Sequence, residues 1–382
     1  MSYELLDYHR GLLTDAARMS GWKAAVCEAV RPGQVVLDLG AGTGILSLLA
    51  CAAEAGRVYA IEQSAIIEVA REAARAAGFG DRIRFFHQSS WEVQLPERVD
   101  VVLGEVFGHF GLNDSLAAAL ADARERFLKP GGVLVPESVE MWAVPVEAAD
   151  WRQKVIESWG EDLGGFNYLG SRKRALNTLN RIRFGAAAAL AEPVCLGRVS
   201  PLEASRSTWS GRAQFRISRD GELGGLGGWC VGRLTRNVSI TNSPFAAAPL
   251  AWPQAMLAVE KPVAVTAGDT VEAEVQSGPY GPWTIWNWQV EVKAGEASRA
   301  RFRHSTFQGQ LISLEQIRKQ SESFTPQAGP YAEAVKAVLE LCDGSRTLAA
   351  IREEMARRFP GLFVDAAQAA RFVARIVGSL CG

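Results

Sequence analysis

The feature that most constrains this chain is a predicted strand that runs directly into a glycine-rich turn and then a helix, VVLDLGAGTGIL at residues 35–46. Gly40, Gly42 and Gly44 let a ligand lie close to the backbone, and the helix that follows offers free N–H groups at its start. Short apolar runs and Ala-rich stretches alternate from residue 34 to about residue 137, which predicts a parallel sheet with crossover helices. The sequence therefore predicts a Rossmann-like α/β domain that binds a ligand at this turn.

Two acidic residues beside the turn indicate which ligand it binds. Glu62 ends the next predicted strand, where a carboxylate can accept hydrogen bonds from both hydroxyls of a ribose. Without that context it would be an exposed acid at a strand end. A dinucleotide site has the pattern G-x-G-x-x-G, but here the third glycine falls one position early. Asp38 precedes the turn, where it would repel a pyrophosphate but suits the cationic amino-acid end of S-adenosylmethionine, the cofactor we expect.

Composition argues against several other classes of protein. The 41 Lys and Arg residues against 42 Asp and Glu residues leave a formal charge of -1, so we do not expect nucleic acid as a partner. The N-terminus lacks the apolar core of a signal peptide and no run is long enough to span a bilayer, which predicts a cytoplasmic protein without a membrane partner. Six scattered cysteines form no C-x-x-C pair, so we interpret them as reduced packing residues and expect no metal.

The pattern changes beyond residue 141. A Trp-rich, basic stretch from about residue 150 to 183 is expected to be helical, and alternating segments such as TVEAEV and WQVEV predict antiparallel strands. Trp283, Trp286 and Trp288 are expected in the core of this all-β domain. A polar linker then precedes three short amphipathic helices, for which Thr347 and Asp365 are plausible N-caps. The expected bounds are 1–140 for the cofactor domain, 141–310 for the β domain, 311–327 for the linker and 328–382 for the C-terminal module.

A second motif, GEVFGHFGLNDSL at residues 104–116, follows the predicted strand 99–103. It resembles the double-glutamate loop of the protein arginine methyltransferases, with Glu105 in the place of the first glutamate and Asp114 in that of the second. Further marks of that family occur in the same chain order: residues 9–18 are similar to its N-terminal helices, TNSP at 241–244 and WPQ at 252–254 to its barrel motif, and STF at 305–307 to its closing strand.

This resemblance covers residues 1 to about 310 and implies an architecture and a set of roles. The cofactor domain would be followed by an antiparallel β-barrel whose helical arm, at about 150–183, mediates a homodimer. Glu105 and Asp114 would bind a substrate guanidinium in fork geometry. Arg18 would bind the carboxylate group of the cofactor. Ser90 or Trp91 takes the place of an adenine-binding glutamate. The expected cofactor-binding residues are His9, Arg18, Asp38, Gly40, Gly42, Gly44, Glu62, Ser90 and Trp91, and the expected substrate-binding residues are Tyr3, His109 and Trp252.

Departures from the family leave the acceptor open. Asp114 is one methylene shorter than glutamate and is also a natural N-cap for the helix predicted after it. The family's Thr-His pair is replaced by Leu250-Ala251. His109 suits a general base near neutral pH, or it packs among its aromatic neighbours. The alternatives to a peptide or protein N-methyltransferase are a small-molecule methyltransferase on the same fold and a protein that binds S-adenosylmethionine without turnover.

The C-terminal stretch at residues 338–351 resembles the PqqD-like peptide-binding domain, a small winged-helix-like module that pairs a sheet with three helices. Such modules bind the leader peptide of a ribosomally made precursor as an added strand, which would make the acceptor a precursor peptide. Residues 308–319 are the only candidate for the sheet, and their pattern is a poor match to a strand. The alternative is a helical cap or dimerisation element.

Overall fold

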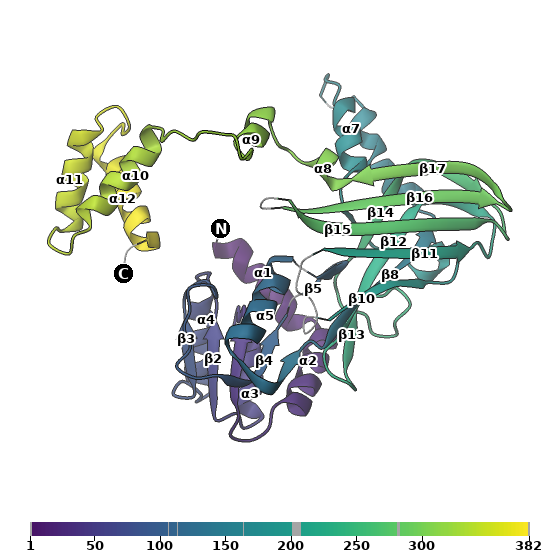
Figure 1. Cartoon of the computed structure of the whole chain (residues 1–382). Helices are drawn as coiled ribbons and strands as arrows, with labels where there is room; N and C mark the ends of the chain where they lie inside the picture. Colours follow the sequence, from purple (N-terminus) through teal and green to yellow (C-terminus); the bar gives the residue numbers. More distant parts are fainter. Residues whose placement is uncertain are drawn as a thin grey trace. The chain divides into compact units, whose positions relative to one another are not determined.

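The structure is a computed structural model that describes residues 2–105, 107–112, 114–162, 164–200, 208–280 and 283–380. The chain divides into two compact units, residues 1–310 and residues 311–382 (Figure 1). In the described part of the chain, no helix has both the length and the apolar character needed to cross a membrane.

Unit 1 begins with two helices and a parallel sheet. Its elements are α1 (Ser2–Thr14), α2 (Ala16–Ala29), β1 (Val35–Leu39), α3 (Ile45–Ala52), β2 (Arg57–Ile61), α4 (Ile67–Ala76), β3 (Ile83–Phe86), β4 (Val99–Gly104), β5 (Phe107–Gly108), β6 (Gly111–Leu112), α5 (Asp114–Arg126) and β7 (Leu128–Val135). The sheet order is β3-β2-β1-β4-β7 with parallel neighbours throughout. The order reverses beside β1, and open α/β sheets bind ligands at the carboxyl ends of strands at such a point. The predicted Rossmann-like domain is confirmed.

Strand β1 is apolar on both sides because both faces of this sheet are covered. Val36 packs with Trp22 of α2, whereas Leu37 packs with Leu120 of α5 on the opposite face. Successive side chains of a strand point to opposite faces, so a central parallel strand reads as a continuous apolar run. The run at residues 35–39, apolar except for Asp38, therefore places β1 in the middle of the sheet, directly before the glycine turn.

The second part of unit 1 is an antiparallel β-barrel. Its strands are β8 (Ser138–Val146), β9 (Asn180–Ile182), β10 (Val194–Val199), β11 (Trp209–Arg216), β12 (Gly221–Arg233), β13 (Ser239–Thr241), β14 (Gln254–Val265), β15 (Thr270–Tyr280), β16 (Trp283–Ala294) and β17 (Ala297–Ser305). One sheet has the order β10-β8-β12-β14-β9 with β13 beside β12, and the other has the order β11-β15-β16-β17. Trp286 and Trp288 are buried in the core between them, as predicted, whereas the Trp283 side chain lies outside the described residues.

The arm between β8 and β10 is helical only in pieces. It consists of α6 (Ala149–Val155), a short 3-10 helix η1 (Glu157–Gly160) and α7 (Leu169–Leu176), and the predicted helical stretch then ends in β9. Gly164 and Gly165 have φ angles of 71° and 84°, a left-handed conformation that a continuing helix does not allow. The predicted closing strand is also shorter than expected. Ser305 accepts a hydrogen bond from the backbone N–H of Phe307, so the chain turns there into α8 (Thr306–Gly309).

In the described residues of unit 2, all the regular secondary structure is helical. It contains α9 (Leu314–Arg318), α10 (Pro330–Leu341), α11 (Leu348–Arg358) and α12 (Ala366–Leu380), and the last three enclose a small apolar core. The predicted N-caps are confirmed, because Thr347 accepts from the N–H of Ala350 at 3.3 Å and Asp365 from that of Gln368 at 2.6 Å. Residues 311–380 contain no strand, and a capping box at Ser313 starts α9 where a sheet would have been needed.

Candidate active site

The glycine turn after β1 has a conformation that only glycine adopts readily. Gly40, Gly42 and Gly44 have φ angles of 72°, 54° and 76°, all in the left-handed region. A Cβ atom on Gly42 would come within 2.8 Å of Cε1 of His9, so α1 lies directly against the turn. The structure thus brings His9 and the glycine turn together at the end of β1, and their role in cofactor binding stays a prediction.

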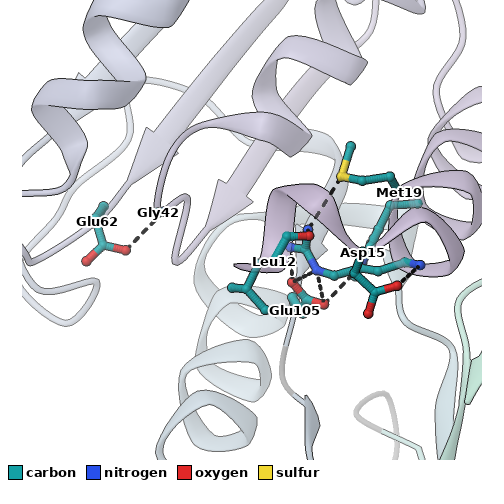
Figure 2. A network of polar contacts seen from close by, with 8 residues as sticks. Leu12, Asp15, Met19, Gly42, Glu62 and Glu105 are labelled. Atoms are coloured by element: carbon teal, nitrogen blue, oxygen red, sulfur yellow. Dashed lines mark hydrogen bonds and ion pairs between the residues drawn. The ribbon is translucent and has the colours of Figure 1, made fainter. Parts of the chain in front are cut away.

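Glu62 also contacts this turn. Its Oε2 accepts from the N–H of Gly42 at 3.1 Å (Figure 2). Its Oε1 accepts from the N–H of Ser64 at 2.8 Å. The carboxylate is therefore held in place at the end of β2, and each oxygen keeps capacity to accept a further hydrogen bond. This arrangement suits a ligand hydroxyl pair.

Asp38 is fully buried beneath the turn and lacks one partner. Its Oδ2 accepts from both the backbone N–H and the hydroxyl of Ser47, at 2.8 and 2.6 Å, which anchors the first turn of α3. Its Oδ1 is buried with no hydrogen-bond partner among the described residues. Burial raises the pKa of Asp38 to about 6, against the lowering effect of the Ser47 hydrogen bonds. A cationic donor from a ligand would satisfy Oδ1 and favour the ionised form.

Glu105 follows β4 and is bound by two residues of α2. The Nε of Arg18 donates to Oε1 and Oε2 of Glu105 at 2.8 and 3.0 Å, and Nη2 of Arg18 also pairs with Oε2 (Figure 2). The indole Nε1 of Trp22 donates to Oε1 at 3.2 Å. Arg18 also donates through Nη1 to the carbonyl of Leu12 at 3.1 Å. The predicted cofactor arginine thus holds the predicted catalytic acid in this structure.

His9 lies between these charges as a neutral group. Burial lowers the pKa of its imidazole and Arg18 lowers it further, while Glu62 and Glu105 oppose the shift. The lowered pKa leaves the ring uncharged at neutral pH. It therefore contributes shape and a hydrogen-bonding nitrogen against the glycine turn, without adding a positive charge.

Asp15 connects α2 to the barrel, and sequence reasoning missed it. Its Oδ1 accepts from the N–H of Arg18 at 3.1 Å as the N-cap of α2, and its Oδ2 accepts from the N–H of Ala251 at 2.8 Å. An Asp before a helical stretch is a capping signal visible in the sequence, but its second contact lies 236 positions away. The carboxylate couples the helix that bears Arg18 to the loop that bears Trp252.

The replacement of the family's Thr-His pair by Leu250-Ala251 has a packing explanation. Leu250 is buried in the same apolar cluster as Trp22, and Trp252 packs against that cluster while partly buried. An apolar residue at position 250 therefore joins the barrel to α2 by burial, and only the backbone of Ala251 makes a polar contact with Asp15.

The structure does not bring every predicted residue into this cluster. Trp91 is 58% exposed, and the contact described for Ser90 is its carbonyl accepting from Arg126 at 2.7 Å. The imidazole of His109 is largely buried and its pKa is lowered by that burial and by Arg181, with an opposing hydrogen bond to the backbone of Leu179. The burial of this ring, rather than its pKa, favours the packing interpretation of His109 over a role as general base.

Two further predictions fall partly outside the described residues. Tyr3 belongs to α1 and Asp114 is the first residue of α5, but nothing is described of either side chain. Among the residues whose positions are described, no group of three or more His, Cys, Asp or Glu side chains could hold a metal ion.

Comparison with known proteins assigns the enzyme class. Residues 36–132 match the model of the family described as "Methyltransferase domain". Protein arginine N-methyltransferase PRMT10 of Oryza sativa subsp. japonica is 29% identical over 308 residues, covering 71% of this chain and 80% of that protein. The probable protein arginine N-methyltransferase 6 of Arabidopsis thaliana is 34% identical over 160 residues, covering 41% of this chain and 37% of that protein.

Solved structures agree with the fold. The Arabidopsis thaliana protein arginine methyltransferase 10 superimposes with a TM-score of 0.69 at 23% identity, covering 79% of this chain and 98% of that chain. The Trypanosoma brucei PRMT1 enzyme-prozyme complex with AdoHcy gives a TM-score of 0.70 at 20% identity, covering 80% and 100%. The chain contains a methyltransferase domain with a Rossmann-like fold, followed by a β-barrel.

Proposed function

We propose that this enzyme transfers the methyl group of S-adenosylmethionine to a guanidino nitrogen of arginine side chains in a protein or peptide. The observation that carries the proposal is the carboxylate of Glu105, which follows β4 and is held by Arg18 and Trp22 beside α2. The relatives named above are arginine methyltransferases, which supports the same acceptor.

Glu105 already binds a guanidinium in this structure. Arg18 approaches its two oxygens through Nε and Nη2, which is the bidentate geometry that a carboxylate and a guanidinium prefer. A substrate arginine presents the same planar fork, so the carboxylate of Glu105 is chemically suited to bind it. In the proposed complex Glu105 orients the substrate guanidinium, and Asp114 at the start of α5 is the proposed second acid.

The residues around the glycine turn fit S-adenosylmethionine. The unpartnered Oδ1 of Asp38 would accept from its ammonium group, Glu62 would bind its ribose hydroxyls, and Arg18 would hold its carboxylate. When bound, the cofactor supplies an electrophilic methyl group on a sulfonium sulfur. The protein's part is to align the acceptor nitrogen with that methyl group and to exclude water. Arg18 would then contact both Glu105 and the cofactor carboxylate, which links cofactor binding to the position of the acid.

The proposal includes a homodimer formed through the arm. Trp159, Phe166, Tyr168 and Leu169 are large apolar side chains that are between 37% and 69% exposed within one short stretch of chain. Soluble monomers rarely leave such side chains gathered in solvent, so this stretch is suited to bury against a second copy.

For unit 2 we propose a docking role toward the peptide substrate. Its helices α10 to α12 form a core of their own, and its described residues provide no sheet edge to which a leader peptide could add as a strand. Any leader would therefore bind against the helices, in a mode different from the one that the PqqD-like resemblance implies.

The test is intact-mass analysis of arginine-containing peptides, and of any precursor peptide encoded nearby, incubated with the enzyme and S-adenosylmethionine. We expect mass gains in methyl units that fragmentation maps to arginine and that disappear in Glu105→Gln. Glu72→Gln, at an exposed position on α4, is the matched control and should retain activity. Methylation that maps to another residue, or to a small molecule alone, would refute the arginine acceptor.

A further inference from the structure

The loop that follows Glu105 touches the barrel at each residue from Phe107 to Phe110. Strand β12 presents Gly228, Cys230 and Gly232 toward it, three positions that share one face because side chains of a strand alternate. The thiol of Cys230 donates to the carbonyl of Gly108 at 3.4 Å. The barrel therefore contacts the loop between the two acids of the proposed arginine clamp.

Two aromatic rings of this loop lie over glycines of β12. A Cβ atom added to Gly228 would come within 2.5 Å of the Phe110 ring, and one added to Gly232 within 2.6 Å of the Phe107 ring. Phe110 is buried and packs against Trp286 in the barrel core with ring centroids 5.3 Å apart. The missing side chains at the two glycines thus set how closely the loop can approach β12.

A single buried amide completes the connection. Asn242 is fully buried, and its Nδ2 donates to the carbonyls of His109 and Pro253 at 2.9 and 2.8 Å. Its Oδ1 accepts from the N–H of Cys230 at 3.0 Å, and its own carbonyl accepts from Gln254 at 2.7 Å. Carbonyl oxygens can only accept a hydrogen bond, so the atom that faces these two carbonyls must be Nδ2, and the orientation of the amide is fixed. The loop that follows Glu105 is called the acid loop below. Asn242 therefore hydrogen-bonds to three segments, namely the acid loop, β12 and the segment after Trp252.

We propose that Asn242, Gly228 and Gly232 are positioning residues that set the place of the acid loop, and with it the geometry of the acceptor site. The proposal rests on the proposed function for its catalytic consequence, but the placement of the loop can be measured without it. Because a misplacement of about 1 Å at a reacting centre can cost about 100-fold in rate, small displacements of this loop should be visible in kcat.

The experiment combines peptide kinetics with hydrogen exchange in the full chain. Gly232→Ala and Asn242→Ala should lower kcat by about 100-fold while the Kd for S-adenosylmethionine, measured by calorimetry, stays unchanged. Amide protection in residues 105–112 should fall in both variants, while protection of the parallel sheet is retained. Adding Phe107→Leu to Gly232→Ala makes room for the new methyl group and should restore part of the kcat, a rescue that a general loss of stability would not give.

Gly185→Ala is the matched control, since a Cβ atom at Gly185 meets nothing within 4 Å, and it should behave as the wild type. Unchanged kcat and unchanged exchange of residues 105–112 in both test variants would overturn the proposal. If Asn242→Ala fails to fold, Gly232→Ala and its rescue decide the matter alone. A wild-type enzyme that methylates no arginine peptide would refute the proposed function, and the exchange measurement would still decide the positioning role.

Discussion

Arg18 and Glu105 form an ion pair between α2 and the end of β4, in which the two side chains are only 5% and 15% exposed. Eighty-seven positions separate them in the chain. Removing one partner of such a pair leaves an uncompensated charge in a poorly solvated place, which is strongly destabilising. The pair therefore couples the packing of α2 to the position of the Glu105 carboxylate.

The first prediction concerns the geometry of that pair. Arg18→Lys keeps the charge but replaces a bidentate fork by a single ammonium group. Loss of one charge-assisted hydrogen bond of about 1.5–3 kcal/mol should reduce kcat/KM by roughly 10- to 160-fold. Steady-state kinetics with an unmethylated arginine peptide that the wild type accepts as substrate would measure this. Arg10→Lys is the control, because Arg10 pairs with Asp7 in an exposed position and should contribute little. Wild-type kinetics for Arg18→Lys would contradict the assignment.

The glycine turn gives a second prediction, with a matched backbone control. Gly42→Ala places a methyl group 2.8 Å from the His9 ring and forces alanine to a φ of 54°, so S-adenosylmethionine binding should be lost. Gly33→Ala meets the same backbone strain of about 1–2 kcal/mol at a φ of 79° but contacts nothing within 4 Å. Calorimetry should therefore show binding in Gly33→Ala and none in Gly42→Ala. Equal affinity in both would mean that the turn does not approach the cofactor.

The elements that sequence could predict are those set by short-range patterns. The apolar run before the turn, the alternating glycines and Glu62 lie within 28 positions of one another, and the structure joins Glu62 to Gly42 through a hydrogen bond. Capping preferences likewise located the starts of α11 and α12, because they depend on a residue and its own helix.

The contacts that sequence could not predict are those between distant segments. Asn242 reaches His109 across 133 positions and Asp15 reaches Ala251 across 236, and neither pair has a local signature. Tertiary packing, which no single-residue pattern encodes, selects such partners. The helical content of the arm was overestimated although a local signal was present. Gly164 and Gly165 are helix breakers that are visible in the sequence itself.

The third prediction is a pH dependence of cofactor affinity. The pKa of Asp38 is raised to about 6 from 3.8, so its proton is bound more tightly in the folded protein than in the unfolded chain. Folding stability should accordingly fall as pH rises from about 4 to about 6, because the folded state binds more protons in that window. Affinity for the ammonium group should follow the ionised form, about tenfold weaker at pH 5 than at pH 7.

Calorimetric titration of S-adenosylmethionine from pH 5 to pH 8 checks this dependence. Asp38→Asn cannot ionise, so its weaker affinity should be flat across the range. A wild-type affinity that does not change below pH 6 would show that Asp38 does not bind the charged end of the cofactor.

A fourth prediction concerns the arm. Replacing Phe166 and Leu169 together by serine removes two of its exposed apolar side chains and should convert a dimer to a monomer in light scattering at micromolar concentration. Leu311→Ser, at a side chain that is 86% exposed outside the arm, is the control and should leave the oligomeric state unchanged. A wild-type chain that is already monomeric would remove the dimer from the proposal.

The last prediction separates the two units. The apolar core of α10 to α12 is made by residues of unit 2 alone, so deleting residues 328–382 should leave the folding of unit 1 and its Kd for S-adenosylmethionine intact. If unit 2 docks the substrate, the deletion should raise KM for a full-length precursor peptide, because docking adds effective concentration without changing the chemistry. A short arginine peptide without the upstream segment should be methylated equally by both proteins. Equal KM for the full-length peptide would refute the docking role and leave unit 2 as a structural element.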